Sequence, residues 1–140
     1  MISRNAIWAN SGKKPTGCPL TWTKRTPHMG TSWIYGAEYA NGYWIIVGGN
    51  SAAAWATDPT GLWTSMSVGM PPALEIYNIV YGGGYWVAVA EGGNLTYTVD
   101  PTGRSGWVVG APAFFPDAVM GVAYGDGHWV IGGKIGRAHV

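Results

Sequence analysis

Short apolar or aromatic segments alternate with turn-forming residues through the middle of the chain. One group of four such segments covers residues 34–39, 43–47, 53–57 and 63–68. They are separated by Asn-Gly, Gly-Gly and Asp-Pro-Thr-Gly, which favour turns because Gly accepts a positive φ and Pro holds φ near −65°. No stretch sustains the 3.6-residue period of an amphipathic helix. The pattern therefore predicts four short strands in one antiparallel sheet.

The second segment of this group is apolar on both of its faces. Tyr43, Ile45 and Val47 point to one side of a strand, and Trp44 and Ile46 point to the other. An antiparallel sheet commonly keeps one face in water. We therefore expect both faces of this sheet to be covered by other parts of the protein.

The same pattern recurs along the chain. Residues 39–44, Tyr-Ala-Asn-Gly-Tyr-Trp, return as Tyr-Gly-Gly-Gly-Tyr-Trp at 81–86 and as Tyr-Gly-Asp-Gly-His-Trp at 124–129. The tryptophans that end the three copies are 42 and 43 residues apart, and we expect them in the core. A period of this length, with four short strands in each unit, is typical of a β-propeller.

We therefore predict an all-β fold, a partial β-propeller of about three blades, each a four-stranded antiparallel sheet with a repeat of about 42 residues. The incomplete propeller covers residues 1–134. Its parts are blade remnants in 1–30, blades at 31–70 and 73–110, and a half blade at 118–133. Since closed propellers have roughly 4–8 blades, we expect missing blades or a homo-oligomer to close the ring.

The turn before the fourth segment resembles a known propeller motif. Residues 56–63, Ala-Thr-Asp-Pro-Thr-Gly-Leu-Trp, look like a degenerate Asp-box, the Ser-x-Asp-x-Gly-x-x-Trp hairpin of bacterial-neuraminidase repeats. Asp58 and Trp63 match that motif, whereas Ala56 replaces its Ser and Thr60 replaces its Gly. The resemblance implies a propeller blade and no catalytic role, because Asp-boxes lie on the outer turns of blades.

The second copy matches the same motif less closely. Thr98, Asp100 and Trp107 fit it with two extra residues before the tryptophan. The wider repeat is similar to repeats of uncharacterised phage tail and bacterial surface proteins. Paired glycines at 48–49 and 132–133 also resemble kelch repeats, although the kelch period is nearer 50.

Asp58 and Asp100 occupy equivalent positions, and each is followed by Pro-Thr-Gly ending at Gly61 or Gly103. Two carboxylates could act as a general acid and base. A turn residue whose carboxylate accepts backbone N–H groups is the alternative. Repetition favours the turn, since every unit needs one. We therefore interpret all four residues as structural.

Tyr43, Tyr85 and His128 follow the Gly turn in the three copies and differ in type, so they are our candidates for a glycan-binding face. Glu91 replaces Gly49 of the first copy at a strand–turn junction and is the fourth candidate, with a solvated turn residue as its simpler interpretation.

Among the other aromatic residues, Trp63 and Trp107 on the outer segment are expected to be partly exposed. His28 and His128 lack metal-ligand spacing. The sequence thus predicts no metal, cofactor or catalytic residue.

Composition and charge exclude several classes of protein. Only 11% of the 140 residues are charged and the net charge is +1, which argues against nucleic-acid binding through a basic surface. The single cysteine, Cys18, excludes an intrachain disulfide framework. No apolar run approaches the ~20 residues of a membrane span. The first residues lack the pattern of a secretory signal.

Three classes of function stay open. The first is a non-enzymatic propeller region of a phage virion or bacterial surface protein, with structural, adhesive or ligand-binding roles and with glycans or other chains as partners. The second is a fragment of a sialidase-like glycoside hydrolase. The arginine cluster of a sialidase is absent from these blades, because Arg4, Arg25 and Arg104 are not equivalent in the repeat. A catalytic part in missing sequence stays open as an alternative. The third is a small lectin that assembles a propeller by oligomerisation. We favour the first, and with it a virion or cell-surface location.

The six C-terminal residues, 135–140, read Ile-Gly-Arg-Ala-His-Val. This string is similar to a common sequencing adapter translated in frame. We interpret it as non-native read-through and give it no functional weight.

Overall fold

The computed structural model describes residues 7–9, 22–27, 29–30, 32–103, 106–110 and 117–134. The predicted all-β class is confirmed in this part of the chain, where the strands form antiparallel sheets. A short 3-10 helix, η1 (Glu91–Gly93), is the one helical element among the described residues. The tail at 135–140 and most of the predicted remnant at 1–30 lie outside the described residues.

The first complete sheet contains the four segments that the hydrophobic pattern predicts. Its strands are β3 (Ile34–Ala40), β4 (Tyr43–Gly48), β5 (Ala53–Ala56) and β6 (Thr64–Met66). They pair antiparallel in the order β3-β4-β5-β6, so each strand lies beside its neighbour in sequence. We call this sheet 2.

The next repeat forms a second sheet with the same order. Its strands are β7 (Ile76–Gly82), β8 (Tyr85–Ala90), β9 (Leu95–Thr98) and β10 (Val108–Val109). They pair in the order β7-β8-β9-β10. We call this sheet 3.

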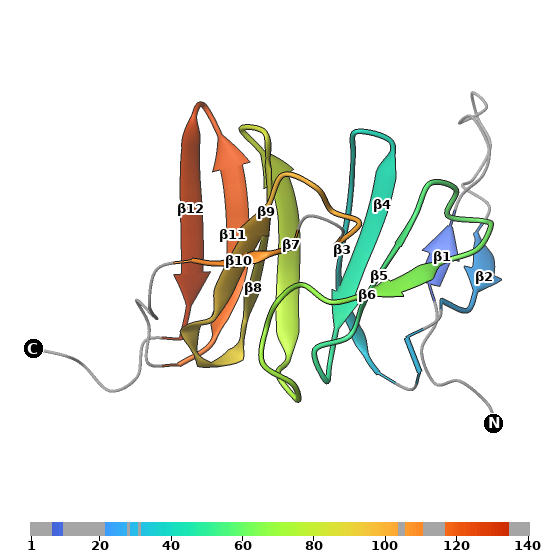
Figure 1. Ribbon diagram of the computed structural model, residues 1–140, viewed down its shortest axis with the longest axis horizontal. Coiled ribbons are helices and arrows are strands. Elements are labelled where there is room, and N and C mark those ends of the chain that lie inside the picture. The colour runs from blue at the N-terminus through green and yellow to red at the C-terminus, as the bar shows by residue number, and fades with distance from the viewer. Residues whose placement is uncertain are drawn as a thin grey trace, which may run out of the picture.

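Two smaller sheets flank the complete ones. Sheet 1 pairs β1 (Ile7–Ala9) with β2 (Thr23–Arg25), and sheet 4 pairs β11 (Val119–Gly125) with β12 (His128–Gly133). By position in the repeat, β11 and β12 are equivalent to the first two strands of sheets 2 and 3. Figure 1 shows the four sheets side by side, with sheets 1 and 4 at the two ends.

The turns between the first two strands explain the repeated glycines. The central residues of these turns are Asn41-Gly42, Gly83-Gly84 and Asp126-Gly127, and all six have a positive φ. Two-residue hairpins with positive φ at both positions twist in the same sense as the strands that they join. The Gly turn therefore sets the register of each pair of strands.

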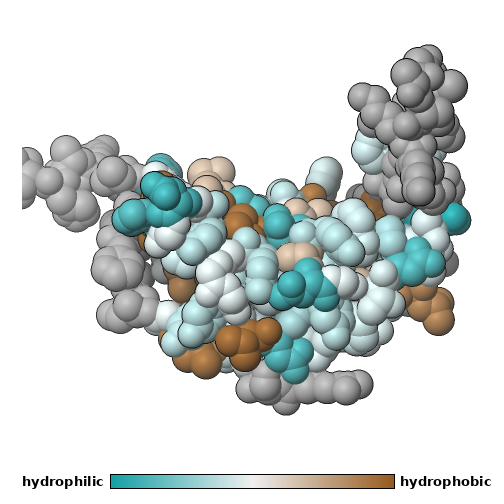
Figure 2. Space-filling view, turned by 90° about the horizontal axis from the view of Figure 1, so that it is seen from above, coloured by the Kyte–Doolittle hydropathy of each residue, from teal (hydrophilic) through white to brown (hydrophobic). Residues whose placement is uncertain are grey.

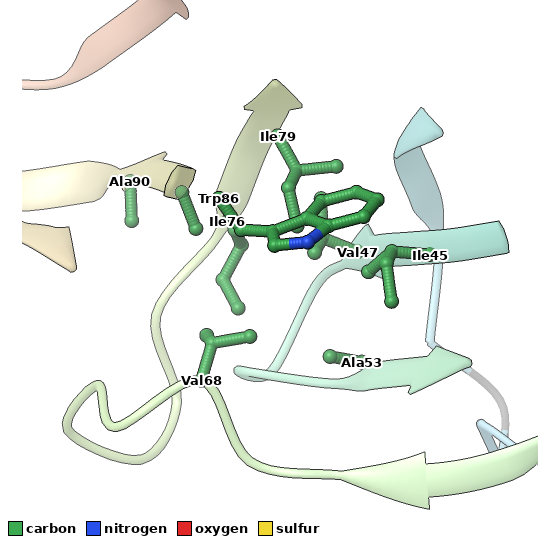
Figure 3. Packing of buried hydrophobic residues seen from close by; sticks show 9 residues of the cluster. Ile45, Val47, Ala53, Val68, Ile76, Ile79, Trp86 and Ala90 are labelled. Atoms are coloured by element: carbon green, nitrogen blue, oxygen red, sulfur yellow. The ribbon is translucent and has the colours of Figure 1, made fainter. Parts of the chain in front are cut away.

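Neighbouring sheets pack face to face through alternate side chains of their second strands. In β4, Ile45 and Val47 belong to a buried cluster with Trp86 of β8, which has no exposed surface. Figure 3 shows the Trp86 indole among these side chains. Ile46 points the other way, into a cluster that includes Ile7 of β1. Both faces of sheet 2 are thus covered, as its sequence predicts.

Sheet 3 repeats this arrangement one step along the chain. Val87 and Val89 of β8 point away from sheet 2 and form a cluster with Val119 and Val122 of β11. Contacts between sheets are concentrated on the first strands, because β7 packs against both β3 and β11. The sheets therefore lie closest together along the line formed by β3, β7 and β11.

One local prediction differs from the structure, and one repeated turn differs between the two copies. Trp63 is only 5% exposed, because its ring packs into the cluster between sheets 1 and 2. Gly61 does not have a positive φ, whereas Gly103 does (+81°). The two turns differ because the second has two more residues before its tryptophan.

Candidate functional site

The turn residues proposed as a glycan face lie at one edge of the molecule. Tyr43, Tyr85 and His128 are the first residues of β4, β8 and β12, and each follows a two-residue turn. The three turns are at the top of Figure 1, and Figure 2 looks onto that edge. Its surface is mostly pale, neither strongly hydrophilic nor strongly hydrophobic.

These three side chains have different surroundings. Tyr43 is half-buried, and its ring meets that of Trp55 edge to face at 5.8 Å. Tyr85 is 44% exposed and borders an apolar cavity of about 290 Å³ between sheets 3 and 4. His128 is exposed, and its Nδ1–H donates to the carbonyl oxygen of Asp126 at 2.6 Å. The structure places them on one edge but does not bring them together in one pocket.

Glu91 lies at the opposite edge. It is the first residue of η1 and directly follows β8, whose first residue is Tyr85. Six strand residues span about 20 Å at roughly 3.3 Å each, so Glu91 and Tyr85 cannot contact one ligand of monosaccharide size. The four candidate residues therefore do not form a single site.

Glu91 borders a groove of about 430 Å³ with both polar and apolar lining. Tyr77 of β7, Asp117 and Lys134 contribute its other side chains with polar groups, and Met120 contributes an apolar wall. The groove thus combines an aromatic ring, two carboxylates and an ammonium group at the junction of sheets 3 and 4. Sequence reasoning found only Glu91 of these residues.

A repeated irregularity in the first strands positions the aromatic residues at this edge. The register shifts between residues 34 and 36, between 76 and 78, and between 119 and 121. A bulge of this kind inserts one residue and re-aims its side chain. The inserted residues are Tyr35, Tyr77 and Met120, and the rings of Tyr35 and Tyr77 lie 5.7 Å apart. Two tyrosines at equivalent repeat positions were the signal that could have identified this edge.

Equivalent backbone hydrogen bonds hold the ends of the second strands against the residues that precede the first strands. The amide of Gly49 donates to the Trp33 carbonyl at 2.8 Å, that of Glu91 to Glu75 at 2.9 Å, and that of Lys134 to Ala118 at 3.0 Å. The backbone around Glu91 is therefore fixed by the fold, whatever its side chain does.

The change from Gly49 to Glu91 in the repeat accompanies a change in the residue that faces it. A Cβ on Gly49 would lie 2.9 Å from the carboxylate of Glu75. The residue equivalent to Glu75 in the next repeat is Ala118, which leaves room for the side chain of Glu91. Glu75 and Glu91 thus place a carboxylate in this region at two successive interfaces, from opposite strands.

The nearby carboxylates help to raise the pKa values of two tyrosines at this edge. A hydrogen bond to Glu75, with smaller contributions from desolvation and from the nearby charges, raises the pKa of Tyr35. Desolvation and the negative charges of Glu91 and Glu75 raise the pKa of Tyr77. Both phenols therefore stay protonated at neutral pH and can donate hydrogen bonds.

Asp58 and Asp100 act as turn residues. Asp58 Oδ1 accepts hydrogen bonds from the Thr60 amide at 2.8 Å and from the Thr60 hydroxyl at 2.7 Å. Asp100 Oδ1 accepts the equivalent pair from Thr102 at 2.9 and 2.6 Å. The hydrogen bonds from Thr60 lower the pKa of Asp58. Both carboxylates are thus engaged locally, in separate turns.

The described residues contain neither a cluster of metal ligands nor a helix that could span a membrane. Among the described residues, no three His, Cys, Asp or Glu side chains gather as metal ligands. Within the same part of the chain, no helix has the length and apolar character needed to cross a bilayer. Neither a search of protein-family models nor a search of curated proteins found a match to this chain.

Proposed function

We propose that this chain is a repeat region of a β-propeller, part of a phage virion or bacterial surface protein, and that it serves as a non-enzymatic binding module. Three features support the propeller. Four-stranded antiparallel sheets recur with a period of about 42 residues. They pack through both faces, and their first strands lie closest together, as in sheets arranged around an axis.

The ligand that we propose is a carbohydrate, and its site is the groove around Glu91. The observation that supports it is that Tyr77, Glu91 and Asp117 line the same groove. Carboxylate oxygens accept hydrogen bonds from sugar hydroxyl groups. An aromatic ring offers an apolar face to the C–H groups of a sugar while its hydroxyl stays polar. A few such polar groups in a concave site fix the orientation of a ligand.

The sialidase-like alternative requires several arginines in one place. Arg25 is the single arginine among the described residues, since Arg4, Arg104 and Arg137 lie outside them. Nothing in the described part of the chain favours this alternative over simple binding.

A glycan array followed by calorimetric titration of the best glycan tests the proposal. We expect Glu91→Gln to weaken binding by about tenfold or more, because loss of a charged acceptor costs roughly 1.5–3 kcal/mol. Glu91 is exposed and its structural hydrogen bond comes from the backbone, so the variant should fold normally.

Asp126→Asn is the matched control, because it makes the same change of charge at the turn edge. It should bind as the unmodified chain does. An array without any binding would rule out a carbohydrate ligand. Binding that survives Glu91→Gln but is lost in Tyr85→Ala would move the site to the turn edge.

A further inference from the structure

The two bulge tyrosines lie side by side at the junction of sheets 2 and 3. Tyr35 is the residue inserted in β3, and Tyr77 is the residue inserted in β7. Their ring centroids are 5.7 Å apart, and the ring planes are tilted by 57°. Tyr35 is 45% exposed and Tyr77 is half-buried. The two rings therefore form one partly exposed aromatic surface that joins the two sheets.

The backbones of β3 and β7 approach each other closely at these residues. A Cβ on Gly36 would lie 3.1 Å from the Cα of Asn78 and 3.3 Å from the carbonyl oxygen of Tyr77. Glycine allows this approach because it has no Cβ. Close backbone packing thus supports the relative position of the two tyrosines.

Tyr77 lies near carboxylates from two interfaces. Desolvation and the negative charges of Glu91 and Glu75 raise its pKa, so both carboxylates are near Tyr77. Glu75 accepts a hydrogen bond from the Tyr35 hydroxyl. Glu91 lines the groove between sheets 3 and 4 together with Asp117. Tyr77 therefore belongs to two adjoining groups, one with Tyr35 and Glu75 and the other with Glu91 and Asp117.

We propose that these two groups are adjoining subsites for one linear, uncharged polysaccharide chain. The first subsite is the groove around Glu91, so the inference rests on the proposed function and extends it. Tyr35 and Glu75 form the second subsite, and Tyr77 connects the two. In each subsite a sugar unit directs hydroxyl groups toward a carboxylate and places C–H groups against a ring.

A chain-like ligand fits because the two groups recur at successive interfaces between sheets. Sheets that pack face to face lie roughly 10 Å apart, so one monosaccharide fills at most one group. A linear polymer presents the same hydroxyl and C–H groups at regular intervals. The repeat of the protein therefore matches the repeat of the ligand.

The charges at this edge favour an uncharged ligand. The two subsites contain the carboxylates of Glu75, Glu91 and Asp117, which repel uronic acids and sulfated sugars within a Debye length of about 10 Å at moderate ionic strength. Lys134 borders the same groove, and its ammonium group would repel a polymer of amino sugars. A neutral chain avoids both penalties.

Calorimetric titration with short and long forms of neutral polymers tests the second subsite. The probes are β-1,4-linked oligomers of glucose, of mannose and of N-acetylglucosamine, each with two and with six units. In the series that binds best, we expect the hexamer to bind about ten times more tightly than the dimer or more. Contact at a second, linked subsite raises affinity in this way.

Tyr35→Ala should remove this advantage of length. The affinity for the hexamer should fall by about tenfold, to that for the dimer, whereas the affinity for the dimer should not change. Tyr39→Ala is the matched control, because Tyr39 is a 53% exposed tyrosine of the same strand that lies toward the Gly turn. It should leave both affinities unchanged. Glu91→Gln should weaken binding of both lengths.

The outcomes separate this inference from the function on which it rests. Equal affinity for both lengths, or an advantage of length that survives Tyr35→Ala, would overturn the second subsite and leave the Glu91 site in place. Absence of binding in every series would overturn both. Tighter binding of hexagalacturonate or of a glucosamine hexamer than of any neutral hexamer would show that the ligand is charged.

Discussion

Two buried threonines of β9 differ in whether their hydroxyl groups are hydrogen-bonded, so the two hydroxyl groups should have opposite effects on the stability of the fold. Thr96 and Thr98 are 1% and 4% exposed and lie on the same face. The Thr96 hydroxyl has no hydrogen-bond partner among the described residues. The Thr98 hydroxyl accepts from the Asp100 amide at 3.1 Å and lies within hydrogen-bond distance of the Asp100 and Gly106 carbonyl oxygens. A buried polar group without a partner costs free energy, whereas a satisfied one contributes a little.

Replacement of each threonine by valine separates the two cases. We expect Thr96→Val to raise the free energy of unfolding by about 1 kcal/mol, since it removes an unpaired hydroxyl and keeps the branched shape. Thr98→Val should lower it by about 1–2 kcal/mol. Urea denaturation of the two variants measures both changes. Effects of the same sign would contradict the hydrogen-bond assignment.

At the scale of the element, the turns keep the repeat regular. Type I′ turns join the first two strands of sheets 2, 3 and 4, and a bulge recurs two residues into each first strand. The Asp-Pro-Thr-Gly segment between β5 and β6 adds a side-chain cap. There Asp58 accepts two hydrogen bonds from Thr60.

The Asp58 turn predicts a defined response to acid. Its hydrogen bonds lower the pKa of Asp58 in the folded state, so its stabilising effect is complete above the unfolded-state pKa of about 3.9 and is lost as the pH falls through the lower, folded-state value. Asp58→Asn keeps the shape without the charge. The stability difference between the two chains should be constant above about pH 5 and should shrink below about pH 4.

Urea denaturation of both chains at pH 7, 5 and 3 measures this difference. A difference that does not change with pH would show that the charge of Asp58 contributes nothing to the turn.

At the scale of the molecule, the sheets form a series in which each packs only on its neighbours. Trp86 belongs to the interface between sheets 2 and 3, whereas Trp129 belongs to the end sheet. In serial architectures, stability is close to a sum of unit and neighbour-interface contributions. Loss of an inner interface should therefore affect more of the chain than loss of an end one.

Two equivalent tryptophans test this expectation. Trp86→Ala should lower the free energy of unfolding by about 3–5 kcal/mol, because it empties a fully buried site. Trp129→Ala should act mainly on sheet 4. Hydrogen exchange followed by mass spectrometry should show faster exchange in β7–β9 and β4 for the first variant, and faster exchange confined to β11, β12 and the facing β8 for the second. Equal spread of both effects would argue against serial packing.

The sequence by itself determined the strands, the turns and the need to bury both faces. Alternation within residues 43–47 and the Asn-Gly turn before them act over a few residues, so no knowledge of the fold is required. The structure places β3 to β6 close to the predicted segments. The burial of Trp63 was not predicted, because it depends on packing against a neighbouring sheet.

Tertiary structure alone decided which side chains share a site. Tyr85 and Glu91 lie at the two ends of β8, so a whole strand separates them. Glu91 instead borders one groove with Tyr77, Asp117 and Lys134. Those neighbours come from another strand and another repeat, and a bulge aims Tyr77 toward them. Local pattern carries no information on such contacts, because they depend on how successive sheets are placed against each other.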